Sequence, residues 1–115
     1  MLTNADCTLL LAEGSGYRIL FARGVHWEEH SGATVGTGSS PAPAATVYIP
    51  FSSLPGETLP ERVSGRDYIM RGAVCVSPDT PVREILAAHP AHTIGKVYRR
   101  DFGSPALHHW QVDTL

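Results

Sequence analysis

The sequence contains few charged residues, only two cysteines and no long hydrophobic run. Charged residues make up 17% of the 115 positions, against roughly 25% in an average soluble domain. The net charge is −2, so the chain lacks the clustered basic face that usually binds nucleic-acid phosphates. A surface with so little charge suits a protein that packs against neighbouring subunits.

Signals of several other protein classes are also missing. No apolar run approaches the roughly 20 residues that span a bilayer, and the N-terminus lacks the basic and hydrophobic regions of a signal peptide. We therefore expect a protein that is made in the cytoplasm and has no membrane segment. The sequence has no nucleophile elbow, P-loop or dinucleotide fingerprint. We expect no catalytic residues, no metal and no cofactor.

The two cysteines, Cys7 and Cys75, fit neither a CxxC pattern nor a disulfide framework. Each lies in an apolar, strand-like run, where a free cysteine is usually a small core residue. We expect two buried, reduced thiols.

Strand patterns dominate what is present. A chain of 115 residues forms one domain, here 1–115, with one modest core. The pattern predicts a mainly β fold, a small β-sandwich or barrel of about six to seven strands with one short α-helix and a long Gly/Ser/Pro/Ala-rich loop. The expected strands cover 7–12, 17–23 with a continuation to 27, 46–51, 68–76, 92–102 and 107–113.

The second of these runs carries a glycine that predicts a bulge. Tyr17, Ile19 and Phe21 alternate on one face, and the alternation resumes after Gly24 with Val25 and Trp27. A glycine inside a strand pattern indicates a bulge or bend. The preceding 13–16 segment, Glu-Gly-Ser-Gly, is expected to be a four-residue hairpin loop.

One short helix is predicted after residue 80. Thr80 is a favourable N-cap and Pro81 suits the first helical position. His89 precedes a proline and therefore ends the helix. A helix this short must dock on the sheet to be stable. Its apolar face consists of Val82, Ile85 and Leu86.

The stretch 31–45 differs in composition from the rest of the chain. It is rich in Gly, Ser, Pro and Ala and is longer than an ordinary connection. Two interpretations stay open: a disordered surface insertion, or an arm that orders against a neighbouring subunit.

The segment His26-Trp-Glu-Glu-His30 matches the H-x-x-E-H pattern of a family of zinc metalloproteases. On a helix the two histidines would share one face and could bind one zinc ion. The neighbouring Val25 and Trp27 instead continue a strand, which would separate the histidines by about 13 Å. We keep a zinc-dependent hydrolase only as an alternative.

The C-terminal strand and the run before it complete the candidates. Trp110 and Val112 are predicted to be core anchors, with His109 and Gln111 on the outer face. The fragment 98–102, Tyr-Arg-Arg-Asp-Phe, interleaves aromatic and basic residues as nucleic-acid stacking surfaces do. An ordinary amphipathic strand also explains that fragment.

Several motifs together resemble a family of small phage and prophage proteins encoded among head and tail morphogenesis genes. They are Met1-Leu-Thr-Asn-Ala-Asp-Cys-Thr8, Arg23-Gly-Val-His-Trp27, Thr46-Val-Tyr-Ile-Pro50, Gly65-Arg-Asp-Tyr-Ile-Met-Arg-Gly72 and Gly103-Ser-Pro-Ala-Leu-His-His-Trp-Gln-Val112. The resemblance implies a virion structural protein, a head-closure subunit of the head-tail connector that forms a ring beneath the portal. It implies no catalytic residues, and it makes a tail-terminator or another neck or tail protein the closest alternative.

That role predicts a homo-oligomeric ring located in the virion neck, with the portal or adaptor protein on one side and tail proteins on the other. Genomic DNA would pass through the ring without specific binding. Ring subunits meet through different patches of neighbouring copies. The residues expected at these interfaces are Ser31, Thr34, Val35, Thr37, Ser39, Pro41, Pro43, Arg66, Asp67 and Arg71.

Overall fold

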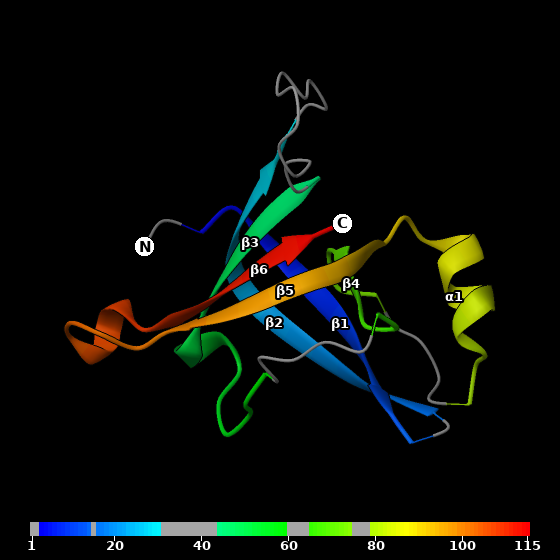
Figure 1. The fold of residues 1–115 in the computed structure, drawn as a ribbon, viewed down its shortest axis with the longest axis horizontal. Helices are drawn as coiled ribbons and strands as arrows, with labels where there is room; N and C mark the ends of the chain where they lie inside the picture. Colours follow the sequence, from blue (N-terminus) through cyan, green and yellow to red (C-terminus); the bar gives the residue numbers. More distant parts are fainter. Residues whose placement is uncertain (1–2, 15, 31–43, 60–64, 75–78) are drawn as a thin grey trace.

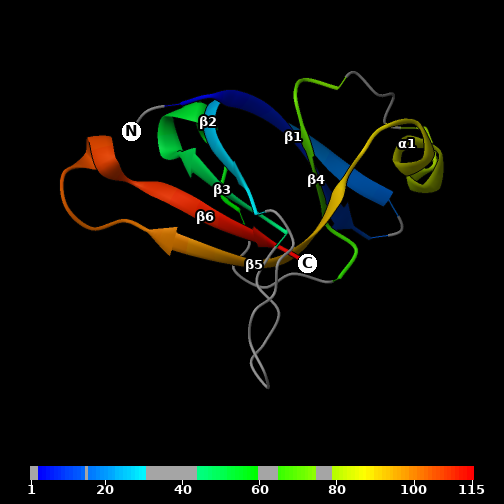
Figure 2. The same ribbon diagram turned by 90° about the horizontal axis from the view of Figure 1, so that it is seen from above.

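The computed structural model describes residues 3–14, 16–30, 44–59, 65–74 and 79–115. Within them, six antiparallel strands close into a barrel in the order β1-β2-β3-β6-β5-β4, with one helix outside it (Figures 1 and 2). The predicted mainly β fold is confirmed, as a barrel. Its elements are β1 (Ala5–Glu13), β2 (Gly16–Glu29), β3 (Ala45–Pro50), β4 (Tyr68–Arg71), α1 (Val82–Ala88), β5 (His92–Arg100), β6 (His109–Thr114) and the 3₁₀ turns η1 (Phe51–Ser53) and η2 (Pro105–Leu107).

Strands β1 and β2 form a long hairpin whose loop is shorter than the sequence suggested. Glu13 pairs with Gly16, so two residues connect the strands where four were expected. Gly14 has a φ of 59°, the left-handed conformation that a two-residue hairpin loop requires. Glu13 and Gly16, which were expected in the loop, therefore belong to β1 and β2.

The predicted bulge at Gly24 is present and changes which face of β2 points inward. Ala5 pairs with Val25 and Asp6 with Arg23, which leaves Gly24 as the extra residue, at a φ of 76°. Its N–H donates to the Asp6 carboxylate at 3.0 Å. An extra residue reverses the alternation.

The reversal places the two halves of the β2 pattern on different faces. After the bulge, Val25 and Trp27 are buried in the barrel core. Before it, Leu20 and Ala22 are the core residues. The expected Tyr17, Ile19 and Phe21 face therefore points out of the barrel: the first two pack in the outer cluster below, and Phe21 is 46% exposed.

The barrel interior holds the main hydrophobic core. Every strand contributes to it, and Cys7 is buried there, as expected; Cys75 lies outside the described residues. Trp110 is 2% exposed and stacks on Phe51 with ring centroids 4.3 Å apart. The prediction of Trp110 and Val112 as core anchors is confirmed.

Helix α1 lies outside the barrel (Figure 2), and a second, smaller hydrophobic cluster lies beneath it. Ile85 of the helix packs with Leu10 of β1 and Met70 of β4. This cover explains why the middle of β1 is buried on both faces: Cys7, Leu9 and Leu11 face the core, and Leu10 meets the helix. The docking predicted for the short helix is confirmed.

The helix begins one residue later than predicted. The carbonyl of Pro81 accepts the first helical hydrogen bonds, so Pro81 is the N-cap and Val82 the first helical residue. Thr80, the predicted cap, precedes it, and its carbonyl accepts a hydrogen bond from the Tyr17 hydroxyl. At the other end His89 is extended, as the following proline requires.

Candidate functional site

The outward side chains of β2, β3, β6 and β5 form a polar face with three rows that follow the strand register. The central row holds His26, Tyr48, Gln111 and Tyr98. One flanking row holds Glu28, Thr46, Asp113 and Lys96, and the other Pro50, His109 and Arg100. We refer to these eleven residues as the polar face, because alternation sends their neighbours into the core.

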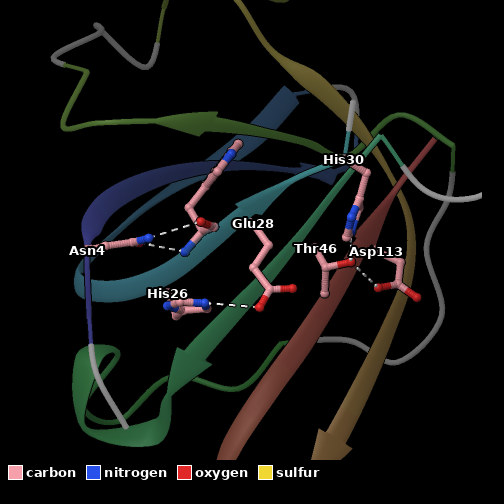
Figure 3. Close-up of polar contacts among 7 residues, drawn as sticks. Asn4, His26, Glu28, His30, Thr46 and Asp113 are labelled. Carbon is pink, nitrogen blue, oxygen red and sulfur yellow. Dashed lines mark hydrogen bonds and ion pairs between the residues drawn. The ribbon is translucent and has the colours of Figure 1, made fainter. Parts of the chain in front are cut away.

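Two separate groups of polar contacts involve the first flanking row, and Figure 3 shows His30, Thr46 and Asp113 in one and His26 and Glu28 in the other. The Thr46 hydroxyl donates to Asp113 Oδ1 at 3.2 Å and lies 2.9 Å from His30 Nε2. Gln111 Nε2 donates to the same carboxylate oxygen at 3.3 Å. His26 Nε2 contacts Glu28 Oε1 at 3.1 Å. The Thr46–Asp113 hydrogen bond therefore crosses from β3 to β6, whereas Glu28 and Gln111 make their contacts along their own strands.

Aromatic rings connect the central row to the opposite flanking row. The ring of Tyr48 lies 5.8 Å from that of His26 and 5.8 Å from that of His109, the latter edge to face. Lys96 Nζ and the Arg100 guanidinium each lie 4.7 Å from the centroid of Tyr98. Two cations thus lie at cation–π distance from the Tyr98 ring.

The pKa of Tyr48 reports on its position between charges of both signs. Burial raises the pKa of its phenol above the ordinary value, and Glu28 and Asp113 raise it further, while Arg100 lowers it. In the strand register, Glu28 and Asp113 lie in the row on one side of Tyr48 and Arg100 in the row on the other. The hydroxyl stays protonated near neutral pH and can donate a hydrogen bond to a partner.

The histidines of the H-x-x-E-H segment lie on an extended chain, as the strand interpretation predicted. His26 belongs to β2 and His30 follows its last residue, so the helical spacing that a zinc protease motif needs does not form. Their ring nitrogens contact Glu28 and Thr46, respectively. Among the described residues, no three His, Cys, Asp or Glu side chains are grouped closely enough to hold a metal ion.

The predicted interface residues fall into two groups. Those of the arm, Ser31, Thr34, Val35, Thr37, Ser39, Pro41 and Pro43, lie outside the described residues. Arg66 and Arg71 are exposed, before and at the end of β4. Asp67 is only 3% exposed and its carboxylate accepts a hydrogen bond from the Ala12 N–H at 2.7 Å. Asp67 holds β4 against β1, so a partner has no access to it and it leaves the predicted interface.

A pocket of about 440 Å³ lies beside α1, on another side of the barrel. Tyr17, Tyr68, Arg66 and Asp79 line it together with the residues that begin the helix. Burial raises the pKa of the Tyr17 phenol, and the nearby Asp79 raises it further.

Sequence reasoning found single residues of the polar face but not the face itself. It placed His109 and Gln111 outside the barrel and singled out His26 and Tyr98. It missed Tyr48, Thr46 and Asp113, which join them, because the pairing of β3 with β6 connects segments far apart in the chain. The alternation within 46–50 was the available signal, since it sends Thr46 and Tyr48 to the face opposite Val47 and Ile49.

The family model described as "Family of unknown function (DUF6751)" matches residues 2–114. The chain belongs to this family. The matched residues include every strand of the barrel and the outer helix of this DUF6751 protein. Searches among curated proteins and solved structures find no match. No helix in the described part of this DUF6751 protein is long and apolar enough to cross a membrane.

Proposed function

We propose that this protein is a structural subunit of a phage head-tail connector, a head-closure protein whose copies form a ring between portal and tail. The polar face carries this proposal. Its side chains extend across four strands and are held by hydrogen bonds and ring contacts within the face. A face ordered before it meets a partner loses little conformational entropy on binding. Such a face suits protein docking rather than chemistry on a small substrate.

The anchoring of the arm also supports assembly. The His30 N–H donates to the Ala44 carbonyl at 3.0 Å, and Glu29 pairs with Ala45. The chain therefore leaves the barrel and returns to it at adjacent points, and 31–43 can contact another subunit without changing the barrel. The ends of this segment lie beside Glu28, Thr46 and Asp113 of the polar face.

The charge of the protein fits passage of DNA through a ring. The net charge of −2 gives little attraction to phosphates. A strongly basic lining would bind the genome as it passes. In this proposal the partners of the subunit are portal and tail proteins, and DNA passes without specific binding.

The decisive experiment deletes the gene in the phage or prophage that encodes it and examines the particles by electron microscopy. We expect DNA-filled heads that leak or lack tails, and complementation by the wild-type gene should restore tailed particles. Normal infectious particles from the deletion strain would overturn the proposal. A gene position outside any head and tail cluster, for instance in a metabolic operon, would count equally against it.

The tail-terminator alternative predicts a different defect. For a tail terminator we expect stable filled heads with tails of altered length, whereas for a head-closure protein we expect heads that lose DNA. Measuring tail length and DNA retention in the same particles therefore separates the two roles.

A further inference from the structure

The two ends of the sheet β2-β3-β6-β5 carry opposite charge, and we infer that copies of this chain bind head to tail through them. We define the acidic end as Glu28, Glu29, Asp113 and Leu115. We define the hairpin end as Arg99, Arg100, His109, Phe102 and Leu107. In the proposed function this contact would join ring neighbours, and in that respect the inference rests on it.

The acidic end lies where β2 and β6 finish. Glu28 aligns with Thr46, and Thr46 with Asp113, so two carboxylates occupy the same row of the face. Glu29 is the last residue of β2 and is exposed. Lys96 belongs to this row, but its ammonium lies over the Tyr98 ring toward the middle of the face. Leu115 follows, with 77% of its side chain exposed.

The hairpin end lies at the other end of the same strands, where β5 turns into β6. Arg100 aligns with His109, and Arg99 with Trp110. Asp101 neutralises Arg99 at 3.1 Å, which leaves Arg100 as the arginine at this end without an ion pair among the described residues. Beyond them Phe102 is 69% and Leu107 56% exposed. Figure 1 shows that this hairpin extends away from the barrel on the side opposite α1.

These two ends complement each other in charge and in apolar exposure. Among the described residues, four large hydrophobic side chains are well exposed, and three of them lie at these ends: Phe102, Leu107 and Leu115. A hairpin end placed on the acidic end of the next copy pairs Arg100 with Glu28 or Asp113 and covers exposed apolar side chains. Two hairpin ends facing each other would instead oppose like charges.

A contact between two different patches is heterologous, and it repeats from copy to copy until it closes a ring or extends as a filament. The second copy is therefore the occupant that the charge pattern selects. The spacing between the ends supports this geometry. Glu28 and Arg100 are four register positions apart, or about 13 Å along the strands, so the two ends are separate patches.

The test exchanges one charge at each end. Arg100→Glu makes both ends acidic, and Glu28→Lys places a cation in the acidic end, where it would face Arg100 of the next copy. Sedimentation velocity of the purified full chain at low ionic strength should show concentration-dependent oligomers for the wild type. Each single variant should associate at least roughly tenfold more weakly, because like charges then face each other. An equimolar mixture of the two variants should regain association, because every contact in it can again join opposite charges.

Matched controls come from α1, on the far side of the molecule. Arg83→Glu and Glu84→Lys make the same two charge changes at exposed helix positions, and we expect both to associate like the wild type. Phe102→Ser should weaken association without changing the melting temperature, because the side chain is exposed.

Three results would overturn the inference. They are a wild type that stays monomeric at all concentrations, variants that associate normally, and a mixture of the two charge variants that stays monomeric. Each outcome is distinct from failure of the proposed function. Leaking heads with a monomeric protein would leave the connector role standing and remove this contact, whereas oligomers from a protein that is dispensable for the phage would do the reverse.

Discussion

Trp110 is the residue on which the C-terminal strand depends. Its ring is buried, stacks on Phe51 and has an indole N–H with no hydrogen-bond acceptor among the described residues. We expect Trp110→Ala to lower the free energy of unfolding by about 3 to 5 kcal/mol, since it leaves a large cavity. Trp110→Phe should cost only about 1 to 2 kcal/mol, because it keeps a ring and removes the unpaired donor. Urea unfolding measures both.

The exposed Leu107 is the control for that series. Leu107→Ala should change stability by less than about 0.5 kcal/mol. If Trp110→Ala cost no more than this control, Trp110 would not be a core anchor.

Because of Cys7, the free energy of unfolding depends on pH in the alkaline range. Burial raises the pKa of its thiol from 9.0 to about 12, with a further contribution from Asp6. Above pH 9 the unfolded chain loses this proton while the folded chain keeps it. The free energy of unfolding therefore falls with rising pH, by up to about 1.4 kcal/mol per pH unit from this group.

Comparing wild type with Cys7→Ala between pH 8 and 10.5 isolates that effect. The variant loses some packing at every pH, but it should show the smaller decline above pH 9. Tyr17 and Tyr48 also have raised pKa values, and their contribution cancels because both proteins contain them. Parallel stability curves for the two proteins would contradict the prediction.

At the scale of elements, the packing of α1 against the barrel depends on a single buried side chain. Ile85 is 2% exposed and is the helix's only buried residue in the described structure. A helix of seven residues has no stability of its own. We expect Ile85→Ala to cost about 2 to 4 kcal/mol and to increase hydrogen exchange at Glu84 and His89 first. Arg83→Ala, next to it but exposed, should leave both unchanged.

The arm can be tested as an element because its ends are paired in the barrel. Replacing 31–43 by Asn-Gly connects His30 to Ala44 through a two-residue hairpin loop. A shorter loop has a smaller entropic cost of closure. The melting temperature should therefore be retained. In the proposed connector role, phage carrying this variant should yield heads without tails. Normal tailed particles with the short turn would show that the arm is not an interface.

Elements were easier to predict from the sequence than the contacts between them. Alternation located all six strands, Gly24 marked the bulge and the proline after His89 ended the helix. The bulge also reversed the alternation, however, so the face of Tyr17 was not predictable from spacing alone. The polar face needed the β3–β6 and β5–β6 registers, which join residues 46 and 113 and residues 98 and 111. Local pattern carries no information about such pairings.

At the scale of the whole molecule, the barrel closes most weakly between β4 and β5. Only two residue pairs join these strands, Tyr68 with Thr93 and Ile69 with His92, whereas nine pairs join β1 to β2. The Ile94 N–H donates to the Asp67 carbonyl across the same seam at 2.8 Å. Local opening there breaks few hydrogen bonds and leaves the long hairpin intact.

Native-state hydrogen exchange followed by NMR tests this order of opening. The amide of Ile94 should exchange at least roughly tenfold faster than that of Leu9, which pairs with Leu20 in the β1–β2 hairpin, because the seam opens without global unfolding. Val112 is the control, since β6 is paired on both sides, with β3 and with β5, and its amide should be protected like Leu9. Equal exchange at Ile94, Leu9 and Val112 would mean that the barrel opens only as one unit. In that case its closure would depend on the core shared by all strands, and the number of pairs at the seam would not set the barrel's weakest point.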